Sequence, residues 1–175
     1  GNDRYIYQYM SEKFPQDEIK WDMSKIKLVT LDIEVKSEDG FPSPDSCSEE
    51  MLTISIQDYN TKQILTWGRK PYTPSQKNVT YFHHEEEVDM LRAFINWWNE
   101  DPPEVITGWN CRLYDIPYLC GRVDRIMGTK EMKRLSPWNI IQHDEVYING
   151  RPHNVYNIAG VTTLDFMDLY KKFTY

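Results

Sequence analysis

The stretch Leu28–Val35 limits what this chain can fold into more than any other part of the 175-residue sequence. It reads Leu-Val-Thr-Leu-Asp-Ile-Glu-Val, so β-branched and aliphatic residues surround two acids. This composition favours a β-strand, and the hydrophobic neighbours favour a central position in a sheet. Side chains alternate between the two faces of a strand, so Asp32 and Glu34 point to the same face, with backbones about 6–7 Å apart.

Two carboxylates on one face of a central strand repel each other and lose hydration, which is costly without compensation. A pair of divalent metal ions would supply that compensation, because hard cations such as Mg²⁺ prefer oxygen ligands. The alternative is an edge strand whose acidic face is solvated. The spacing of Asp32 and Glu34 does not by itself decide between these two interpretations.

A third acid, Asp115, follows a predicted buried strand over 105–107 and the segment Gly108-Trp109-Asn110. We expect it at the start of a helix over 115–127, where Pro117 is tolerated in the first turn. Sites in α/β proteins commonly form where a strand leads into a helix. Aspartate is also a preferred N-cap residue, so capping of this helix is the alternative role for Asp115.

The rest of the sequence alternates strands and helices after an initial run of strands. The clearest helix is 85–99, where apolar residues recur at helical spacing, and Asn149-Gly150 between two β-prone runs predicts a hairpin. Residues 1–27 are predicted to be a lead-in segment before one domain over 28–175. This order predicts an α/β architecture with a mixed sheet. The expected strands are 28–35, 52–59, 63–67, 79–82, 105–107, 146–148, 155–158 and 161–164, and the expected helices are 85–99, 115–127 and 165–172.

Composition and charge exclude several classes of protein. The chain is 40% hydrophobic and 14% aromatic, which is enough for a core, and no apolar run approaches the roughly 18 residues of a membrane span. Cys47, Cys111 and Cys120 lack zinc-site spacing and indicate reduced thiols in a cytoplasmic protein. The net charge of −7 argues against a basic nucleic-acid clamp. It is compatible with an enzyme that meets phosphate through metal ions held by carboxylates.

Two segments taken together resemble a known family. Leu31-Asp32-Ile33-Glu34 resembles the first exonuclease motif of family-B DNA polymerases, and Gly108-Trp109-Asn110 with Tyr114-Asp115-Ile116-Pro117-Tyr118 resembles the second. The resemblance extends from about Trp21 onward. Three further segments are similar to the replicative polymerases of tailed phages in particular: Asp39-Gly40-Phe41-Pro42, Arg134-Leu135-Ser136-Pro137 and the run from Leu164 to Phe173.

The resemblance implies a ribonuclease H-like fold with flanking helices and an inserted β-hairpin. It also implies removal of 3′-terminal nucleotides from single-stranded DNA by two Mg²⁺ or Mn²⁺ ions. Asp32 would bridge both ions, Glu34 would bind the ion that activates water, and Asp115 would support the second ion. The implied partners are the single-stranded 3′ end of DNA, the remainder of a polymerase chain and, through it, a sliding clamp. For a phage protein, the implied location is the cytoplasm of the bacterial host.

Two further residues are candidates for contacting DNA. Asn110 resembles a motif residue near the terminal nucleotide. Phe41 matches an aromatic residue that stacks against a splayed base, a contact worth roughly 1–3 kcal/mol where it occurs. The alternative for Phe41 is a loop aromatic that covers the core.

One part of the family pattern is missing. The third motif has a Tyr or His followed by a fourth acid, and no Tyr-x-x-x-Asp occurs here. His84 and Asp89 fall between the first two motifs, whereas Asp165 and Asp168 follow the second motif without the preceding Tyr or His. We therefore expect that the chain stops short of the third motif and has little activity alone. The alternatives are a non-catalytic DNA-binding or structural module with the same fold, and a stand-alone RNA exonuclease.

Overall fold

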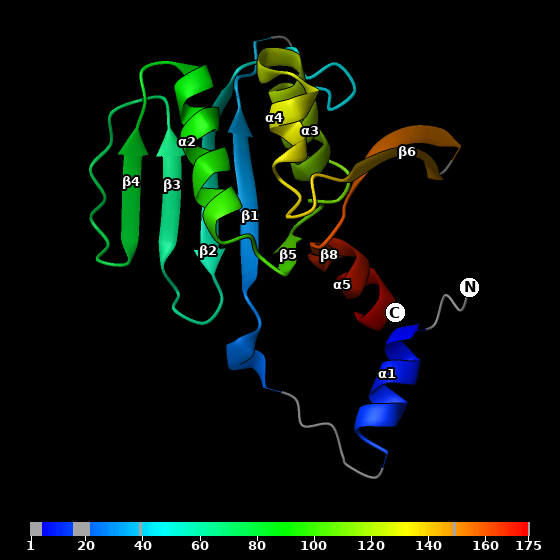
Figure 1. Ribbon diagram of the computed structural model, residues 1–175. Helices are drawn as coiled ribbons and strands as arrows, with labels where there is room; N and C mark the ends of the chain where they lie inside the picture. The colour runs from blue at the N-terminus through cyan, green and yellow to red at the C-terminus, as the bar shows by residue number, and fades with distance from the viewer. Residues whose placement is uncertain (1–4, 16–21, 39, 149, 175) are drawn as a thin grey trace.

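The computed structural model describes residues 5–15, 22–38, 40–148 and 150–174. Within that part of the chain, six strands form one sheet in the order β4-β3-β2-β1-β5-β8, and β6 pairs with β7 in a separate hairpin (Figure 1). The strands are β1 (Leu28–Val35), β2 (Met51–Asp58), β3 (Ile64–Gly68), β4 (Val79–His83), β5 (Val105–Gly108), β6 (Ile141–Ile148), β7 (Arg151–Ile158) and β8 (Thr162–Asp165). The helices are α1 (Tyr5–Lys13), the 3₁₀ helix η1 (Met23–Lys25), α2 (Glu87–Glu100), α3 (Asp115–Met127), α4 (Thr129–Lys133) and α5 (Phe166–Thr174).

Strand β1 lies in the interior of the sheet, as its sequence predicts. It pairs antiparallel with β2 on one side and parallel with β5 on the other, so the sheet is mixed. Val29, Leu31 and Ile33 are buried, whereas Asp32 and Glu34 on the opposite face are exposed. The edge-strand interpretation is therefore wrong, although the solvated face that it proposed is present on this central strand.

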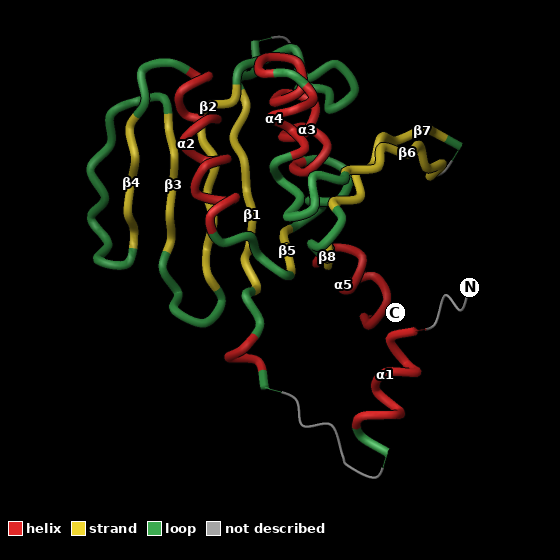
Figure 2. The backbone as a smooth tube through the Cα atoms, in the orientation of Figure 1, coloured by secondary structure: helices red, strands yellow, loops and turns green. Residues whose placement is uncertain are grey.

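The hydrophobic core lies between the sheet and two helices. Helix α2 packs against β2 and β3, helix α3 packs against β1, and the two helices contact each other (Figure 2). Helix α2 buries its apolar stripe, which includes Phe94 and Trp98, and Trp67 of β3 meets Phe94 edge to face. The chain therefore has one covered sheet face, and the acids of β1 lie on the other.

Most predicted elements are confirmed with shifts of one or two residues at their ends. The main correction is the hairpin. Strand β7 begins at Arg151 and not at 155, and β6 begins at Ile141, which pairs with Ile158, and not at 146. Its first half is rich in polar residues and mostly exposed, so no hydrophobic pattern marks it in the sequence. Helix α4 was not predicted either. The predicted turn residue Asn149, the loop residue Asp39 and parts of the lead-in segment lie outside the described residues.

The described part of the lead-in segment forms helix α1 and the 3₁₀ helix η1. None of the nine residues of α1 is buried. Asp22 caps η1 by accepting a hydrogen bond from the backbone N–H of Ser24 at 3.1 Å. No helix in the described ranges is long and apolar enough to cross a membrane.

Candidate active site

Asp32 and Glu34 are fixed in direction by the pairing of β1 with β2. Asp32 lies opposite Ser55 and Glu34 lies opposite Thr53 in the antiparallel register. Because the pairing continues on this side as far as Val35, the two acids cannot rotate away from their common face. The register thus presents two carboxylates side by side near the carboxyl end of a central strand.

Asp115 is joined to the same strand by a hydrogen bond. Strand β5 pairs with β1 only at Leu28–Thr30, so among the described residues the next part of β1 has no paired strand on that side. The backbone N–H of Ile33 there donates to Oδ1 of Asp115 at 3.1 Å. Ile33 is the residue between Asp32 and Glu34, so the acid of the second motif lies next to both acids of the first.

The alternative role of Asp115 as a helix cap is wrong. The N-cap position of α3 is occupied by Tyr114, and no side-chain hydrogen bond caps the helix there. Asp115 is the first residue of the helix, with only 5% of its surface exposed. Its carboxylate accepts a hydrogen bond from the amide of Ile33 on a neighbouring strand.

Burial shifts the pKa values of Asp115 and Asp32, and neighbouring charges also act on Asp115. The pKa of Asp115 is raised from 3.8 to about 7, chiefly by burial. The charges of Asp32 and Asp165 also raise it, whereas the hydrogen bond from the backbone N–H of Ile33 lowers it. Partial burial also raises the pKa of Asp32. The acids therefore lie in a site that disfavours their ionised forms unless a positive charge is added.

The oxygen donors of this site suit a hard divalent cation. Metal ligands of this type must be deprotonated, so a bound cation would have to lower the pKa of Asp115, which burial raises. Within the described ranges, however, no group of three or more His, Cys, Asp or Glu residues is arranged to hold a metal ion. The structure brings Asp115 to β1 but does not contain a preformed cluster of three ligands.

Phe41 and Asn110, the two candidate DNA contacts, line one cavity. Phe41 is 81% exposed and packs on the ring of Tyr114, with ring centroids 4.8 Å apart. The alternative that Phe41 covers the core is therefore wrong. The cavity has a volume of about 410 Å³ and continues onto strand β7 of the hairpin. Its lining residues are Phe41, Pro44, Asp45, Asn110, Leu113, Tyr114 and Arg151 to Asn154.

The sequence reasoning missed the contribution of the hairpin and of Tyr114 to this cavity. Arg151 and His153 bring basic groups to it from β7, far from the two motifs in sequence. The sequence could have indicated Tyr114 as a site residue, since it directly precedes Asp115 within the second motif. The hairpin residues carried none, because only the fold brings β7 beside the loop after β5.

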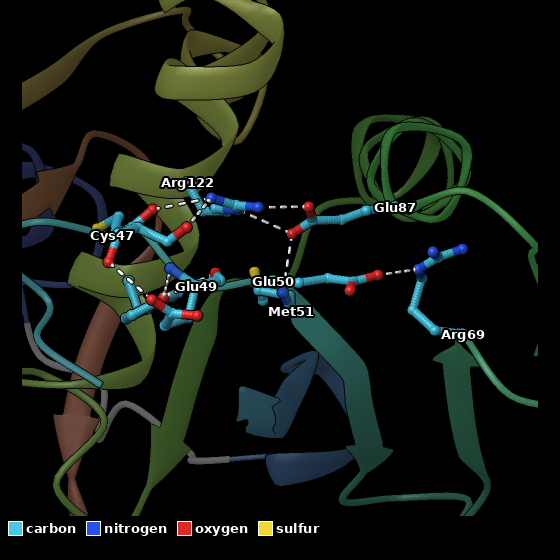
Figure 3. A network of polar contacts seen from close by, with 9 residues as sticks. Cys47, Glu49, Glu50, Met51, Arg69, Glu87 and Arg122 are labelled. Carbon is cyan, nitrogen blue, oxygen red and sulfur yellow. Dashed lines mark hydrogen bonds and ion pairs between the residues drawn. The ribbon is translucent and has the colours of Figure 1, made fainter. Parts of the chain in front are cut away.

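A buried ion pair anchors the segment between β1 and β2, which carries Phe41. Figure 3 shows Glu87 of α2 and Arg122 of α3 paired through two hydrogen bonds, at 2.8 and 2.6 Å. Arg122 also donates to the backbone carbonyls of Cys47 and Ser48, and Glu87 accepts from the backbone N–H of Met51 at 2.8 Å. The segment is thus tied to both helices just before β2 begins.

Comparison with known proteins places these observations in a family. The model of the DNA polymerase family B exonuclease domain matches residues 4–175. The chain is 28% identical, over its whole length, to the DNA-directed DNA polymerases of Escherichia phage RB69 and Enterobacteria phage T4, and covers 22% of each. It is 27% identical to the DNA polymerase catalytic subunit of Saimiriine herpesvirus 2 over 77% of the chain and 14% of that protein. The chain therefore spans about a fifth of the length of its phage relatives.

Proposed function

Because this chain belongs to the exonuclease domains of family-B DNA polymerases, with their ribonuclease H-like α/β fold, we propose that it is the proofreading 3′–5′ exonuclease region of a DNA-directed DNA polymerase. The reaction is hydrolysis of the terminal phosphodiester bond at the 3′ end of single-stranded DNA. The observation that carries the proposal is the hydrogen bond between the backbone N–H of Ile33 and Asp115. It joins the acids of two motifs that lie 82 residues apart.

In this proposal, Asp32, Glu34 and Asp115 would hold two Mg²⁺ or Mn²⁺ ions, which would supply an activated water and charge stabilisation for the leaving oxygen. The protein's part would be to aim the three carboxylates at one place, while bound ions would favour the ionised forms that burial disfavours. The register of β1 and β2 aims Asp32 and Glu34, and the amide of Ile33 orients Asp115 and favours its ionised form. The family resemblance implies that Asp32 would contact both ions, and its charge acts on Asp115 in this structure.

The cavity between Phe41 and the hairpin is the proposed place for the terminal nucleotides. The exposed ring of Phe41, backed by Tyr114, offers a face on which a base can stack. Asn110 supplies an amide group, and Arg151 supplies positive charge for a phosphate. These contacts suit an unpaired 3′ end, since a base must leave the duplex stack before it can lie on an aromatic ring.

We assign the partners and limits of the domain on the same basis. We propose that residues 28–175 are the body of the exonuclease domain and that 1–27 lead into it. None of the nine residues of α1 is buried, although the family match itself begins at residue 4. The remainder of a polymerase chain, and a sliding clamp through it, are the proposed partners. The cytoplasm of a bacterial host is the proposed place of action.

The test is an exonuclease assay of the polymerase that contains this chain. It uses 5′-labelled single-stranded DNA and RNA oligonucleotides of the same sequence, with Mg²⁺. We expect stepwise shortening of the DNA from its 3′ end, and loss of that activity in Asp32→Ala. The matched control is Asp89→Asn, an exposed acid on α2 that pairs with Arg92. Activity that survives Asp32→Ala contradicts the mechanism, and preferential degradation of the RNA supports the alternative of an RNA exonuclease.

A further inference from the structure

The carboxylate of Asp165, at the end of β8, is buried and fully engaged by backbone amides. Only 4% of the residue is exposed. Its Oδ1 accepts hydrogen bonds from the N–H groups of Asn110 at 3.0 Å and Met167 at 2.9 Å. Its Oδ2 accepts from the N–H of Arg112 at 2.9 Å. One acid therefore joins the last strand of the sheet to the loop between β5 and α3.

The backbone of that loop is conformationally constrained at both ends. Asn110 has a left-handed conformation with φ of 59°, which is uncommon for a residue with a side chain. At Gly108 a Cβ atom would lie 2.7 Å from the carbonyl oxygen of Leu31, so the loop begins in tight contact with β1. A change in the backbone conformation of this loop would therefore also change its contact with β1, the strand that carries Asp32.

The same loop leads directly into the helix that carries Asp115. The carbonyl of Asn110 accepts from the N–H groups of Leu113 and Tyr114, at 3.1 and 3.0 Å. The carbonyl of Cys111 accepts from the N–H of Ile116 at 2.9 Å. A shift of the loop at Asn110 or Arg112 is therefore passed on to the first turn of α3.

We propose that Asp165 is a positioning residue of the exonuclease site, which holds the Asn110–Arg112 loop so that Asp115 meets β1 and Asn110 faces the nucleotide cavity. The inference rests on the proposed function and adds a residue to it. Asp165 is not a substitute for a missing metal ligand, because both of its oxygens already accept hydrogen bonds from the protein. Its effect on the reaction passes through the loop.

Asp168 is a natural control for this assignment. It lies one turn further on α5, and its carboxylate is 3.5 Å from the guanidinium of Arg112, so it neighbours the same loop. Its side chain is 52% exposed, however, and it contacts a side chain rather than backbone amides. Removing its charge changes the electrostatics near the loop without removing the hydrogen bonds that shape the backbone.

The experiment compares Asp165→Asn with Asp168→Asn in the full 175-residue chain. An asparagine can keep its oxygen at the Oδ1 position, but its NH₂ group then faces the N–H of Arg112, so one bond is lost and two donors oppose each other.

We measure hydrogen exchange at Asn110 and Arg112, thermal unfolding, Mn²⁺ binding by electron paramagnetic resonance, and binding of a labelled single-stranded oligothymidylate. In Asp165→Asn we expect faster exchange in the loop and about 10- to 100-fold weaker Mn²⁺ binding. In Asp168→Asn we expect binding within about twofold of the unmodified chain.

A purely structural role for Asp165 gives a different pattern. It would lower the unfolding temperature while leaving Mn²⁺ and oligothymidylate binding of the folded protein unchanged, and that result overturns the inference. Asp165→Ser, which keeps a short acceptor, serves if Asp165→Asn fails to fold. Asp32→Asn separates this inference from the proposed function. If Asp32→Asn does not weaken Mn²⁺ binding, the proposed site is wrong; if only the Asp165 variants fail to weaken it, the positioning role alone is wrong.

Discussion

The carboxyl group of Asp115 couples the stability of this protein to pH. Its pKa is raised from 3.8 to about 7 in the folded chain, chiefly by burial. The folded state therefore favours the protonated form. The associated stability is fully present below pH 4 and is lost as the pH rises through about 7.

From this sign we predict that, without divalent metal, the free energy of unfolding falls between about pH 4 and 7 by an amount on the order of a few kcal/mol. Asp115→Asn should remove most of this slope, because an amide does not ionise. Urea unfolding of the unmodified chain and of Asp115→Asn at several pH values measures this slope. Equal slopes in the two proteins would show that Asp115 has an ordinary pKa.

Asp32 provides a second prediction at the scale of single residues. Its charge raises the pKa of Asp115, and its own pKa is raised by partial burial. We predict that Asp32→Asn leaves the thermal unfolding temperature at pH 7 unchanged or raises it, because it relieves repulsion between like charges. Differential scanning calorimetry in metal-free buffer measures the change. A fall of several degrees would mean that Asp32 stabilises the fold.

The residues of the candidate site differ in how far the sequence could predict them. Asp32 and Glu34 were predictable, because the alternation of strand side chains fixes their common face. The contact of Asp115 with Ile33 was not, because it depends on β5 ending early beside β1. The sequence showed only that Asp165 follows the second motif without a preceding Tyr or His, and its three backbone partners appear only in the structure.

At the scale of elements, the pair of Glu87 and Arg122 connects two helices and a loop. Both side chains are only 11% exposed and both are hydrogen-bonded to backbone groups near the start of β2. The sequence could not predict this contact. The two residues are 35 positions apart, and the loop that they hold is polar and shows no periodic pattern. Tertiary packing alone brings them together.

We predict that Arg122→Met destabilises the fold by about 3–5 kcal/mol, because it leaves the carboxylate of Glu87 buried without its charged partner. The double variant Glu87→Gln with Arg122→Met should lose less than the sum of the two single variants. Arg92→Ala, which breaks the exposed pair with Asp89, is the control and should cost less than about 1 kcal/mol. Additive losses in chemical denaturation would show that the two residues act independently.

The helices and the sheet were easier to predict than the hairpin. Helix α2 buries an apolar stripe and α3 begins at a strand-to-helix turn, so both left clear periodic or turn signals. Strands β6 and β7 pair mainly with each other, and most of β6 is exposed. Burial in the hairpin is concentrated at Tyr156 and Ile158 of β7, so most of its residues follow no alternating pattern, and the Asn149-Gly150 turn predicted its existence but not its length.

At the scale of the whole molecule, the net negative charge contrasts with the residues that line the candidate DNA-binding cavity. The net charge of −7 is unfavourable for non-specific binding of DNA. The cavity beside the acids is nevertheless lined by Arg151 and His153 as well as aromatic rings. In the proposed function, recognition of a 3′ end would therefore rest on a small cavity and on added metal ions, and not on a broad basic surface.

The last prediction concerns the nuclease activity of the 175 residues themselves. We predict that they fold but cleave DNA far more slowly than the polymerase that contains them. The buried core of α2, α3 and the sheet supports folding. Two-metal hydrolysis needs both ions placed and a water oriented, and a small misplacement costs on the order of a hundredfold. The chain supplies Asp32, Glu34 and Asp115 but no Tyr-x-x-x-Asp sequence.

A single-turnover assay with 3′-labelled single-stranded DNA, excess protein and Mn²⁺ measures this rate against that of the polymerase. Asp168→Ala is informative here, because its half-exposed carboxylate is the acid of α5 that remains free of backbone hydrogen bonds in the described part of that helix. Cleavage near the rate of the polymerase, lost in Asp168→Ala, would show that α5 completes the active site. Slow cleavage unaffected by Asp168→Ala agrees with a site in which β1 and α3 provide the acids and a further group orients the water.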